Sequence, residues 1–201
     1  MSEITIRRAT AADSRRLTRL VRRSGAYRGP YAVMVDGYQV GGAYIEHHPV
    51  FAATDADGRV LGFYALLLDE AELDLAFVAD DAQGLGIGRL LVAHMKDRAR
   101  AAGLGSVRVV AHPPAEPFYL RTGARRTGTV AAAGRIHWDR PELTYDLTAA
   151  PADGPSGTAA DDPAVHAHGP SGIAAGAPAA PAGAPGTATG RPAADLAAAA
   201  G

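Results

Sequence analysis

The chain has 201 residues, with 20 lysines and arginines against 21 aspartates and glutamates, and it contains no cysteine. The formal net charge of −1 lacks the basic excess of a dedicated nucleic-acid binder, and without cysteine the chain has no disulfide, no thiolate metal site and no cysteine nucleophile. No apolar run reaches the ~18 residues of a membrane span, and residues 1–8 do not resemble a signal peptide, so we expect a cytoplasmic protein with no membrane or nucleic-acid partner.

In chain order, the pattern first predicts a short strand at residues 4–6 and a helix over about 11–24. Thr10 and Asp13 have the spacing of a capping box at the start of this helix, and Leu17, Leu20 and Val21 share one apolar face. The arginines around that face are interpreted as a solvated surface. Residues 25–49 are rich in glycine and tyrosine, and we expect one short helix there, around 36–46.

From residue 50 the pattern is clearer. Strands at 50–54 and 60–68 form a hairpin around the turn at 55–58, and a third strand covers 72–79. A helix over 87–102, a buried strand at 107–111 and a helical segment at 114–122 follow, the two helices being ended by Gly103 and Gly123. Two closing strands are expected near 125–131 and 143–148. This order predicts an α+β (α/β) domain with a mostly antiparallel central sheet flanked by helices.

The last residues of the chain, 149–201, differ in composition from the rest. They contain no aromatic residue, and their only large aliphatic residues are Val165, Ile173 and Leu196. Such a segment buries too little apolar surface to offset the entropy lost on ordering. We therefore expect a folded domain over 1–148 and a disordered Ala/Gly/Pro-rich tail over 149–201 that takes no part in the chemistry.

The sharpest motif is a glycine-rich turn between the third strand and the helix that follows, Gln83-Gly84-Leu85-Gly86-Ile87-Gly88-Arg89. Backbone N–H groups in such a turn, together with a helix N-terminus, suit a diphosphate. The turn lacks the lysine and hydroxyl of a P-loop. Its spacing, Gly-x-Gly-x-Gly after hairpin-linked strands, also departs from the dinucleotide-binding fingerprint.

The pattern Gln83-x-x-Gly86-x-Gly88 resembles the pyrophosphate-binding motif of the GNAT superfamily of N-acetyltransferases. Two further segments are similar to that family: the strand Ala71-Glu-Leu-Asp-Leu-Ala-Phe-Val78 before the turn, and Ala115-Glu-Pro-Phe-Tyr-Leu-Arg-Thr-Gly-Ala124 after it. The opening, Ile6-Arg-Arg-Ala-Thr-Ala-Ala-Asp13, also looks like the start of these enzymes. The resemblance extends over residues 3 to about 148, and it implies a GNAT-like fold with acetyl-CoA as co-substrate.

The resemblance also implies roles for individual residues. Backbone groups at Phe77, Val78 and Ala79 would pair with the pantetheine arm, the N–H of Val78 would hold the oxyanion, and the turn would hold the diphosphate through Gln83, Gly84, Leu85, Gly86, Ile87, Gly88 and Arg89. Pro114 stands where close relatives often carry an asparagine that contacts the cofactor, so one polar contact is missing here.

The catalytic candidates that the resemblance implies are one tyrosine and two carboxylates. Tyr119 matches the tyrosine that protonates the leaving thiolate, although it also suits a core position of its helix. Glu72 and Asp74, on one face of a strand, are candidates for the base that accepts the amine's proton. Either carboxylate would alternatively order the acceptor or pair with an arginine.

The implied reaction is direct attack of a primary amine on the thioester in a ternary complex, with no metal required. The acceptor is expected to be a small molecule, with a peptide amine left open. Aromatic and polar residues of 25–48 and 125–142 would line its pocket or merely pack, namely Tyr27, Tyr31, Tyr38, Tyr44, Arg135, His137 and Trp138. The alternative function is a non-catalytic acyl-CoA-binding or interaction module. A monomer and a homodimer both fit the sequence.

Overall fold

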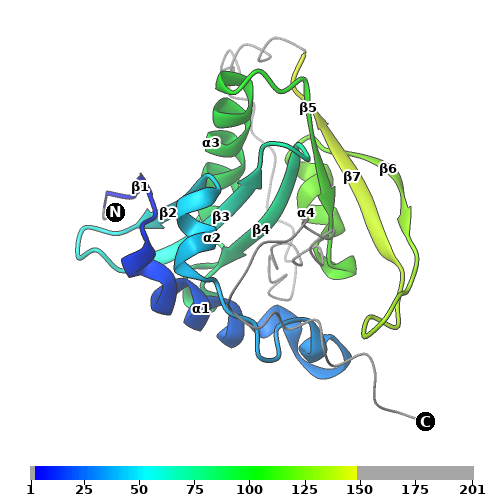
Figure 1. Cartoon of the computed structure of the whole chain (residues 1–201), viewed down its shortest axis with the longest axis horizontal. Helices are drawn as coiled ribbons and strands as arrows, with labels where there is room; N and C mark the ends of the chain where they lie inside the picture. Colours follow the sequence, from blue (N-terminus) through cyan, green and yellow to red (C-terminus); the bar gives the residue numbers. More distant parts are fainter. Residues whose placement is uncertain (1–2, 149–201) are drawn as a thin grey trace, which may run out of the picture.

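A seven-stranded sheet organises the chain in the computed structural model, which describes residues 3–148 (Figure 1). The strands are β1 (Thr5–Arg8), β2 (Val50–Thr54), β3 (Val60–Leu67), β4 (Glu72–Val78), β5 (Ser106–Val110), β6 (Arg125–Val130) and β7 (Arg140–Asp146). The helices are α1 (Ser14–Arg23), α2 (Gly42–His47), α3 (Ile87–Ala101) and α4 (Glu116–Arg121). Short 3-10 turns join them: η1 (Ala11–Asp13), η2 (Gly25–Tyr27), η3 (Gly29–Met34), η4 (Asp80–Ala82) and η5 (Pro113–Ala115).

The strand order is β1-β2-β3-β4-β5-β7-β6, and every neighbouring pair is antiparallel except β4 and β5. The predicted α+β fold with a mostly antiparallel sheet is therefore confirmed. No helix within residues 3–148 is both long and apolar enough to cross a bilayer. The predicted tail, 149–201, lies outside the described residues, so the boundary proposed at residue 148 stays a prediction.

The helix predicted around 36–46 is wrong in its first half. Helix α2 begins only at Gly42. Residues 35–37 form a turn and 38–41 have no regular secondary structure, while the 3-10 segment η3 covers residues 29–34 before them. Gly37 has a φ of +67°, a conformation that an α-helix does not contain, so a helix cannot run through it. The last strand also starts earlier than predicted, at Arg140 rather than 143, with Pro141 as its second residue.

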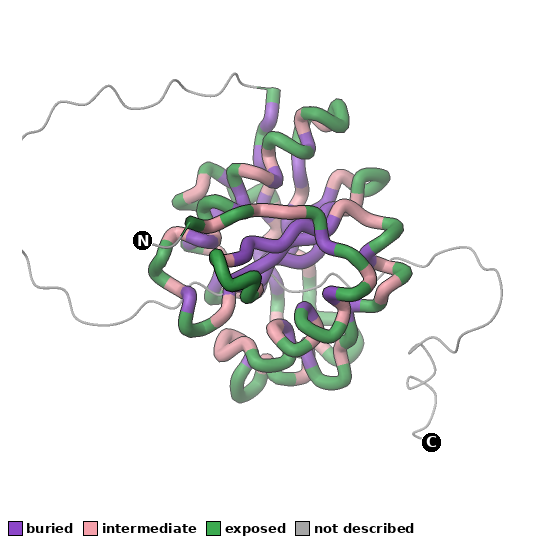
Figure 2. Tube along the Cα trace, turned by 90° about the vertical axis from the view of Figure 1, so that its left-hand side faces the viewer, coloured by how far each residue is buried: buried purple, intermediate pink, exposed green. Residues whose placement is uncertain are grey.

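The sheet separates two apolar layers, and Figure 2 shows the buried stretches gathered in the strands at the centre of the domain. On one face, Leu17 and Val21 of α1 pack with Phe77 of β4. On the other face, Leu91 and Met95 of α3 pack with side chains of β3 and β4. Of the seven residues of β4, all are buried, so this strand forms the floor of both layers.

Strands β4 and β5 diverge soon after they meet. Their parallel ladder contains a single register pair, Glu72 with Arg108, supported by the N–H of Arg108 donating to the carbonyl of Ala71 at 2.8 Å. Beyond that point β5, β7 and β6 swing away from the β1–β4 half of the sheet (Figure 1). The carboxyl-terminal half of β4 therefore has a backbone edge that no strand within residues 3–148 covers.

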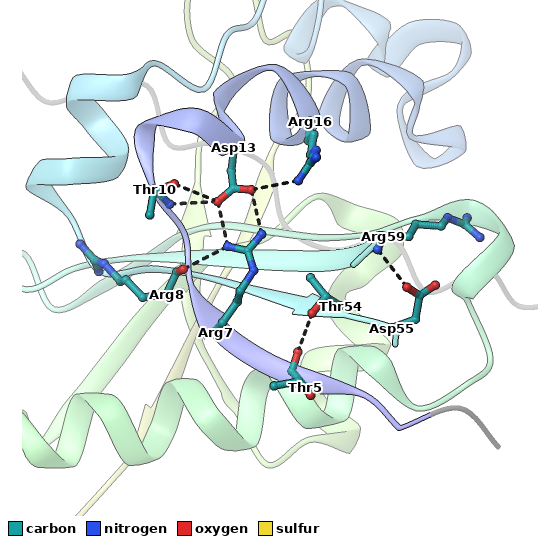
Figure 3. Close-up of polar contacts among 9 residues, drawn as sticks. All are labelled: Thr5, Arg7, Arg8, Thr10, Asp13, Arg16, Thr54, Asp55 and Arg59. Atoms are coloured by element: carbon teal, nitrogen blue, oxygen red, sulfur yellow. Dashed lines mark hydrogen bonds and ion pairs between the residues drawn. The ribbon is translucent and has the colours of Figure 1, made fainter. Parts of the chain in front are cut away.

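A buried carboxylate fixes the entrance to α1 (Figure 3). Asp13 is 3% exposed; its two oxygens accept from both terminal nitrogens of Arg7 at 2.8 Å, and Oδ2 accepts from the N–H of Thr10 at 3.0 Å. The Arg7 contact, against the opposing effect of burial, lowers the pKa of Asp13 to about 2. The side chain of Asp13 thus accepts the bond from the Thr10 backbone that the predicted capping box requires. Through Arg7 it also connects β1 to the start of the helix.

The lowered pKa of Asp13 predicts an acid-sensitive contribution to stability. Because the unfolded carboxyl titrates near 3.8 and the folded one near 2, the contribution is complete above about pH 4 and is lost as the pH falls toward 2. We expect Asp13→Asn to lower the free energy of unfolding by about 2 kcal/mol at pH 7 and by much less at pH 2.5, in urea titrations. Asp97→Asn, at an exposed helix pair with Arg100, is the control, and an equal loss there would contradict the assignment.

Candidate active site

The glycine-rich turn has the backbone conformation that an anion cradle needs. Gly84 and Gly86 have φ values of +80° and +81°, which disfavour any residue with a side chain. A Cβ added at either position would meet no atom within 4 Å, so both face open space. A hollow of about 260 Å³ lies here, lined by Val78, Ala82, Gln83, Gly84, Gly86, Ile87, Gly88 and Arg89.

Helix α3 begins at this hollow. Its N-cap, Gly86, provides no side-chain hydrogen bond, so the first N–H groups of a 15-residue helix point toward the hollow with their partial positive charge. Gly88 serves packing instead, because a Cβ there would lie 3.0 Å from the ring of Phe118 in α4. Gln83 supports the turn by donating to Asp80 at 3.2 Å. An open turn at the N-terminus of a helix is a backbone arrangement that suits an anion.

The edge of β4 beside the gap offers backbone groups. Ala79 donates to the carbonyl of Leu61 on β3 at 2.8 Å, and its own carbonyl accepts from Ala82 at 2.9 Å. Because consecutive N–H groups of a strand point to opposite edges, the N–H of Val78 points away from β3 and into the gap. Val78, rather than Ala79, therefore presents its backbone groups there. Phe77 instead contributes its ring to the core, stacked on Phe63.

Tyr119, on α4, is fully buried. Its ring belongs to the apolar layer on the α3 side, whereas Tyr27 belongs to the layer on the α1 side. Burial, followed by the charge of the nearby Tyr119, raises the pKa of Tyr27. The two phenols are therefore close to each other, although Tyr27 and Tyr119 belong to the layers on opposite faces of the sheet.

Glu72 and Asp74 are both buried on β4, each held by a polar partner. Arg108 of β5 pairs with Oε2 of Glu72 and also with Glu142 of β7. Oε1 of Glu72 is buried and has no hydrogen-bond partner in the described part of the chain. Asp74 accepts a hydrogen bond from the hydroxyl of Tyr44 on α2. The two carboxylates thus face the α1–α2 side, with one oxygen of Glu72 available to a substrate.

The predicted aromatic residues are only partly brought together. Tyr31 lies between two rings, 4.2 Å from His112 and 4.7 Å from Trp138 between centroids. The ring of Tyr27 meets His112 edge-on at 4.7 Å. Tyr38 and Tyr44 lie apart from this cluster, close to Asp74: burial, followed by the Asp74 charge, raises the pKa of both. Arg135 and His137 are exposed.

Unpartnered polar atoms concentrate around this site. Within residues 3–148, five buried side-chain nitrogen or oxygen atoms have no hydrogen-bond partner: Oε1 of Glu72, Nδ1 and Nε2 of His112, Nε1 of Trp138 and Nε of Arg140. Each such atom costs about 1–3 kcal/mol when it stays unpaired. All belong to β4, to β7 with the residues before it, or to the end of β5. The free-energy cost of the unpaired atoms is therefore concentrated in these elements, and a polar ligand bound there would reduce it.

The sequence places His112 at the end of a strand near the site, whereas Arg140 was not among the residues that it singled out. His112 follows shortly after a buried strand, and Arg140 follows the polar and aromatic residues of 135–139. A charged or imidazole side chain next to the end of a buried strand was the sequence feature that could have pointed to both residues. Burial lowers the pKa of His112 to about 4, so the ring is neutral near pH 7.

A larger hollow of about 750 Å³ lies beyond the 79–81 turn, between α1 and the β2–β3 turn. Arg16, Arg19, Arg23 and Arg59 line it, together with Asp57, Asp80 and Asp81. Arg59 pairs with Asp81, and Asp80 accepts from the N–H of Gly25 at 3.0 Å. Its charges are largely balanced, and neither Tyr119 nor the β4 carboxylates line it, so we do not assign the chemistry to it.

Comparison with known proteins identifies a family and a set of similar folds. A family model described as an acetyltransferase (GNAT) domain matches residues 34–138, just over half of the chain. A GCN5-related N-acetyltransferase from Rhodopseudomonas palustris is 20% identical with a TM-score of 0.58, the match covering 73% of this chain and 97% of the other. No curated protein matches the sequence at a significant level.

Two further solved structures contain a coenzyme. Phosphinothricin acetyltransferase from Sinorhizobium meliloti, in complex with acetyl-CoA, is 23% identical with a TM-score of 0.58, covering 77% of this chain and 95% of the other. The yncA structure from Salmonella typhimurium, with its cofactor acetyl-CoA, is 22% identical with a TM-score of 0.56, covering 76% and 99%. At these identities the likeness shows a shared fold.

The buried, neutral His112 predicts a pH dependence of stability. Its pKa falls from 6.5 in the unfolded chain to about 4 in the folded one, so between these values the unfolded state binds more protons and stability rises with pH. We expect the free energy of unfolding to fall by about 2 kcal/mol more in wild type than in His112→Phe when the pH is lowered from 7 to 5. Parallel curves would contradict this, and His47→Gln, at an exposed position, should behave as wild type.

Proposed function

Since this chain belongs to the GNAT family of acetyltransferases, we propose that it transfers the acetyl group of acetyl-CoA to the primary amine of a small molecule by direct attack in a ternary complex. The observation that carries this proposal is the gap between β4 and β5. The glycine turn follows β4 after the short segment η4, the β4 carboxylates lie on the α1–α2 side, and Tyr119 is close to Tyr27 of that side.

The residues at the gap fit acetyl-CoA. The unsubstituted turn at Gly84 and Gly86 and the uncapped start of α3 suit a diphosphate. The free backbone edge of Val78 suits an extended chain that carries amides, since it pairs in the manner of an added strand. The coenzyme supplies an acetyl thioester. In this arrangement Val78 donates its N–H to the thioester oxygen as negative charge develops there.

Glu72 and Asp74 act on the amine. We assign the proton-accepting role to Glu72 because its Oε1 is buried and has no partner among the described residues, while Arg108 fixes the other oxygen. Asp74, held by Tyr44, orients the amine or relays its proton through water. Glu72 lies six residues before Val78 on β4, about 20 Å away along the strand, so it takes the proton of a nitrogen held near Val78 through a chain of waters rather than directly.

Tyr119 acts on the leaving group. The ammonium first releases one proton to solvent, so that the neutral amine attacks. As the N–C bond forms and the C–S bond breaks, a second proton of the nitrogen passes through water to the carboxylate, and the phenolic proton of Tyr119 passes to the sulfur. The carboxylate then reprotonates the phenolate through water, so an ammonium and a thioester become an amide, a thiol and a released proton. The closeness of Tyr119, a residue of the α3-side layer, to Tyr27 of the α1-side layer supports this assignment.

The aromatic cluster on the α1 side supports a small acceptor. Tyr27 is fully covered and Tyr31 and Trp138 are partly buried, and their rings contact one another through His112 and Tyr31. A part-buried cluster of rings suits a compact amine better than the exposed surface of a protein.

We expect the full-length protein to bind acetyl-CoA with micromolar affinity in a calorimetric titration, and Gly86→Glu to abolish binding by placing a strained, negatively charged side chain in the turn.

Loss of the proton donor in Tyr119→Phe should lower kcat about 100-fold with acetyl-CoA affinity unchanged. Tyr145→Phe is the matched control, because this neighbouring buried hydroxyl bonds to Thr122 at 2.6 Å and is given no role in the transfer, and its kcat should match wild type. Absence of acetyl-CoA binding by wild type would refute the function, and a normal kcat in Tyr119→Phe would refute the role of the tyrosine.

We also propose that residues 149–201 take no part in catalysis, since every residue assigned above lies within 3–148. A chain ending at residue 148 should keep the melting temperature, the acetyl-CoA affinity and the kcat of the full chain. Loss of folding on truncation would move the domain boundary.

A further inference from the structure

Arg140 is a buried cation without a counterion. It is 7% exposed, its Nε has no hydrogen-bond partner, and it forms no ion pair with any carboxylate of residues 3–148. Buried guanidinium groups are almost always paired, because removing a charge from water is costly. Burial, and then repulsion from Arg108, lower the pKa of Arg140, in keeping with an uncompensated charge.

The neighbouring charges do not satisfy Arg140. Arg108 already takes both nearby glutamates, Glu72 on β4 and Glu142 on β7. The charge of Glu72 partly opposes the lowered pKa of Arg140, yet the two side chains form no ion pair. The described residues leave Oε1 of Glu72 and Nε of Arg140 unpaired. A ligand that reached both groups would meet an anion on one side and a cation on the other.

The position of Arg140 joins it to the proposed acceptor pocket. As the first residue of β7, it lies two residues after Trp138, and the carbonyl of the next residue, Pro141, accepts from Ala111 at 2.9 Å, beside His112. By the alternation of a strand, Arg140 and Glu142 share a face, and Glu142 meets Arg108 and thereby Glu72. Arg140 therefore lies between the aromatic cluster and the β4 carboxylates.

We propose that the acceptor is an α-amino acid, whose carboxylate is bound by Arg140 while its ammonium group is received by Glu72 and Asp74. This inference rests on the acetyl transfer proposed above and narrows its acceptor. A guanidinium is suited to a carboxylate because its planar fork donates two parallel hydrogen bonds. Trp138 lies two residues before Arg140, and its ring contacts that of Tyr31, so these rings favour an acceptor with an apolar or aromatic side chain. The product is the N-acetylated amino acid, released with the free coenzyme thiol.

The test compares matched acceptors on the full-length protein with acetyl-CoA, measuring thiol release. The standard L-amino acids are screened, each beside its amide, and phenylalanine also beside phenethylamine. We expect at least one amino acid to have a kcat/KM about 100-fold above that of its amide, because the amide leaves the buried Arg140 unpaired. Amides or simple amines used equally well, or no amino acid used at all, would overturn the inference.

Variants assign the effect to Arg140. Arg140→Gln should lose about 100-fold in kcat/KM for the amino acid and little for its amide, while acetyl-CoA affinity stays unchanged. Arg140→Lys keeps the positive charge without the planar guanidinium, so its kcat/KM for the amino acid should lie between those of wild type and Arg140→Gln. Arg125→Gln, on the exposed strand β6, is the charge-matched control and should match wild type. Equal losses on amino acid and amide in both Arg140 variants would refute carboxylate recognition.

Binding provides a readout that does not depend on turnover or on variant folding. In wild type with CoA present, the preferred amino acid should bind in a calorimetric titration and its amide should not, and equal binding would overturn the inference. Failure of the underlying function looks different, because wild type would then not bind acetyl-CoA and would release no thiol with any amine.

Discussion

The guanidinium of Arg108 joins three strands at the point from which the rest of the site is laid out. It pairs with Glu72 on β4 and with Glu142 on β7, and β4 and β5 share their only ladder position there, Glu72 with Arg108. Parallel strands normally continue to pair along their length. Here they separate after one position, so the backbone edge at Val78 is left for a ligand, and the Arg108 bridges hold the halves of the sheet together on the closed side of the gap.

The gap separates two regions of different chemistry on opposite faces of the sheet. On the α3 side, Gly84 and Gly86 leave an open, positively polarised helix start, which suits an anion. On the other side lie the buried carboxylates, the ring of His112 and the guanidinium of Arg140, which suit a compact polar ligand. Tyr119 belongs to the first layer and lies close to Tyr27 of the second. The transfer proposed above would take place where these two regions meet.

The order of the elements could be predicted because each has a local signal. The capping residues Thr10 and Asp13, the alternation in 60–67 and the C-terminal glycines Gly103 and Gly123 act over a few residues. The region 25–49 could not, because Gly37 and the 3-10 segment η3 lack a helical period. Among the site residues, the turn at Gly84–Gly88 was recognisable from its spacing, and Glu72, Asp74 and Tyr119 from their place in the resembling segments.

The sequence by itself determined the family, the mostly antiparallel order of the elements and the position of the glycine-rich turn, since all of these depend on short-range patterns. Only the tertiary structure decided that the N–H of Val78 rather than that of Ala79 faces the gap, because that depends on which group bonds to Leu61. It alone also decided that Arg108 takes both glutamates and leaves Arg140 buried and unpaired. Burial and charge pairing arise between residues more than thirty positions apart, where no local pattern in the sequence records them.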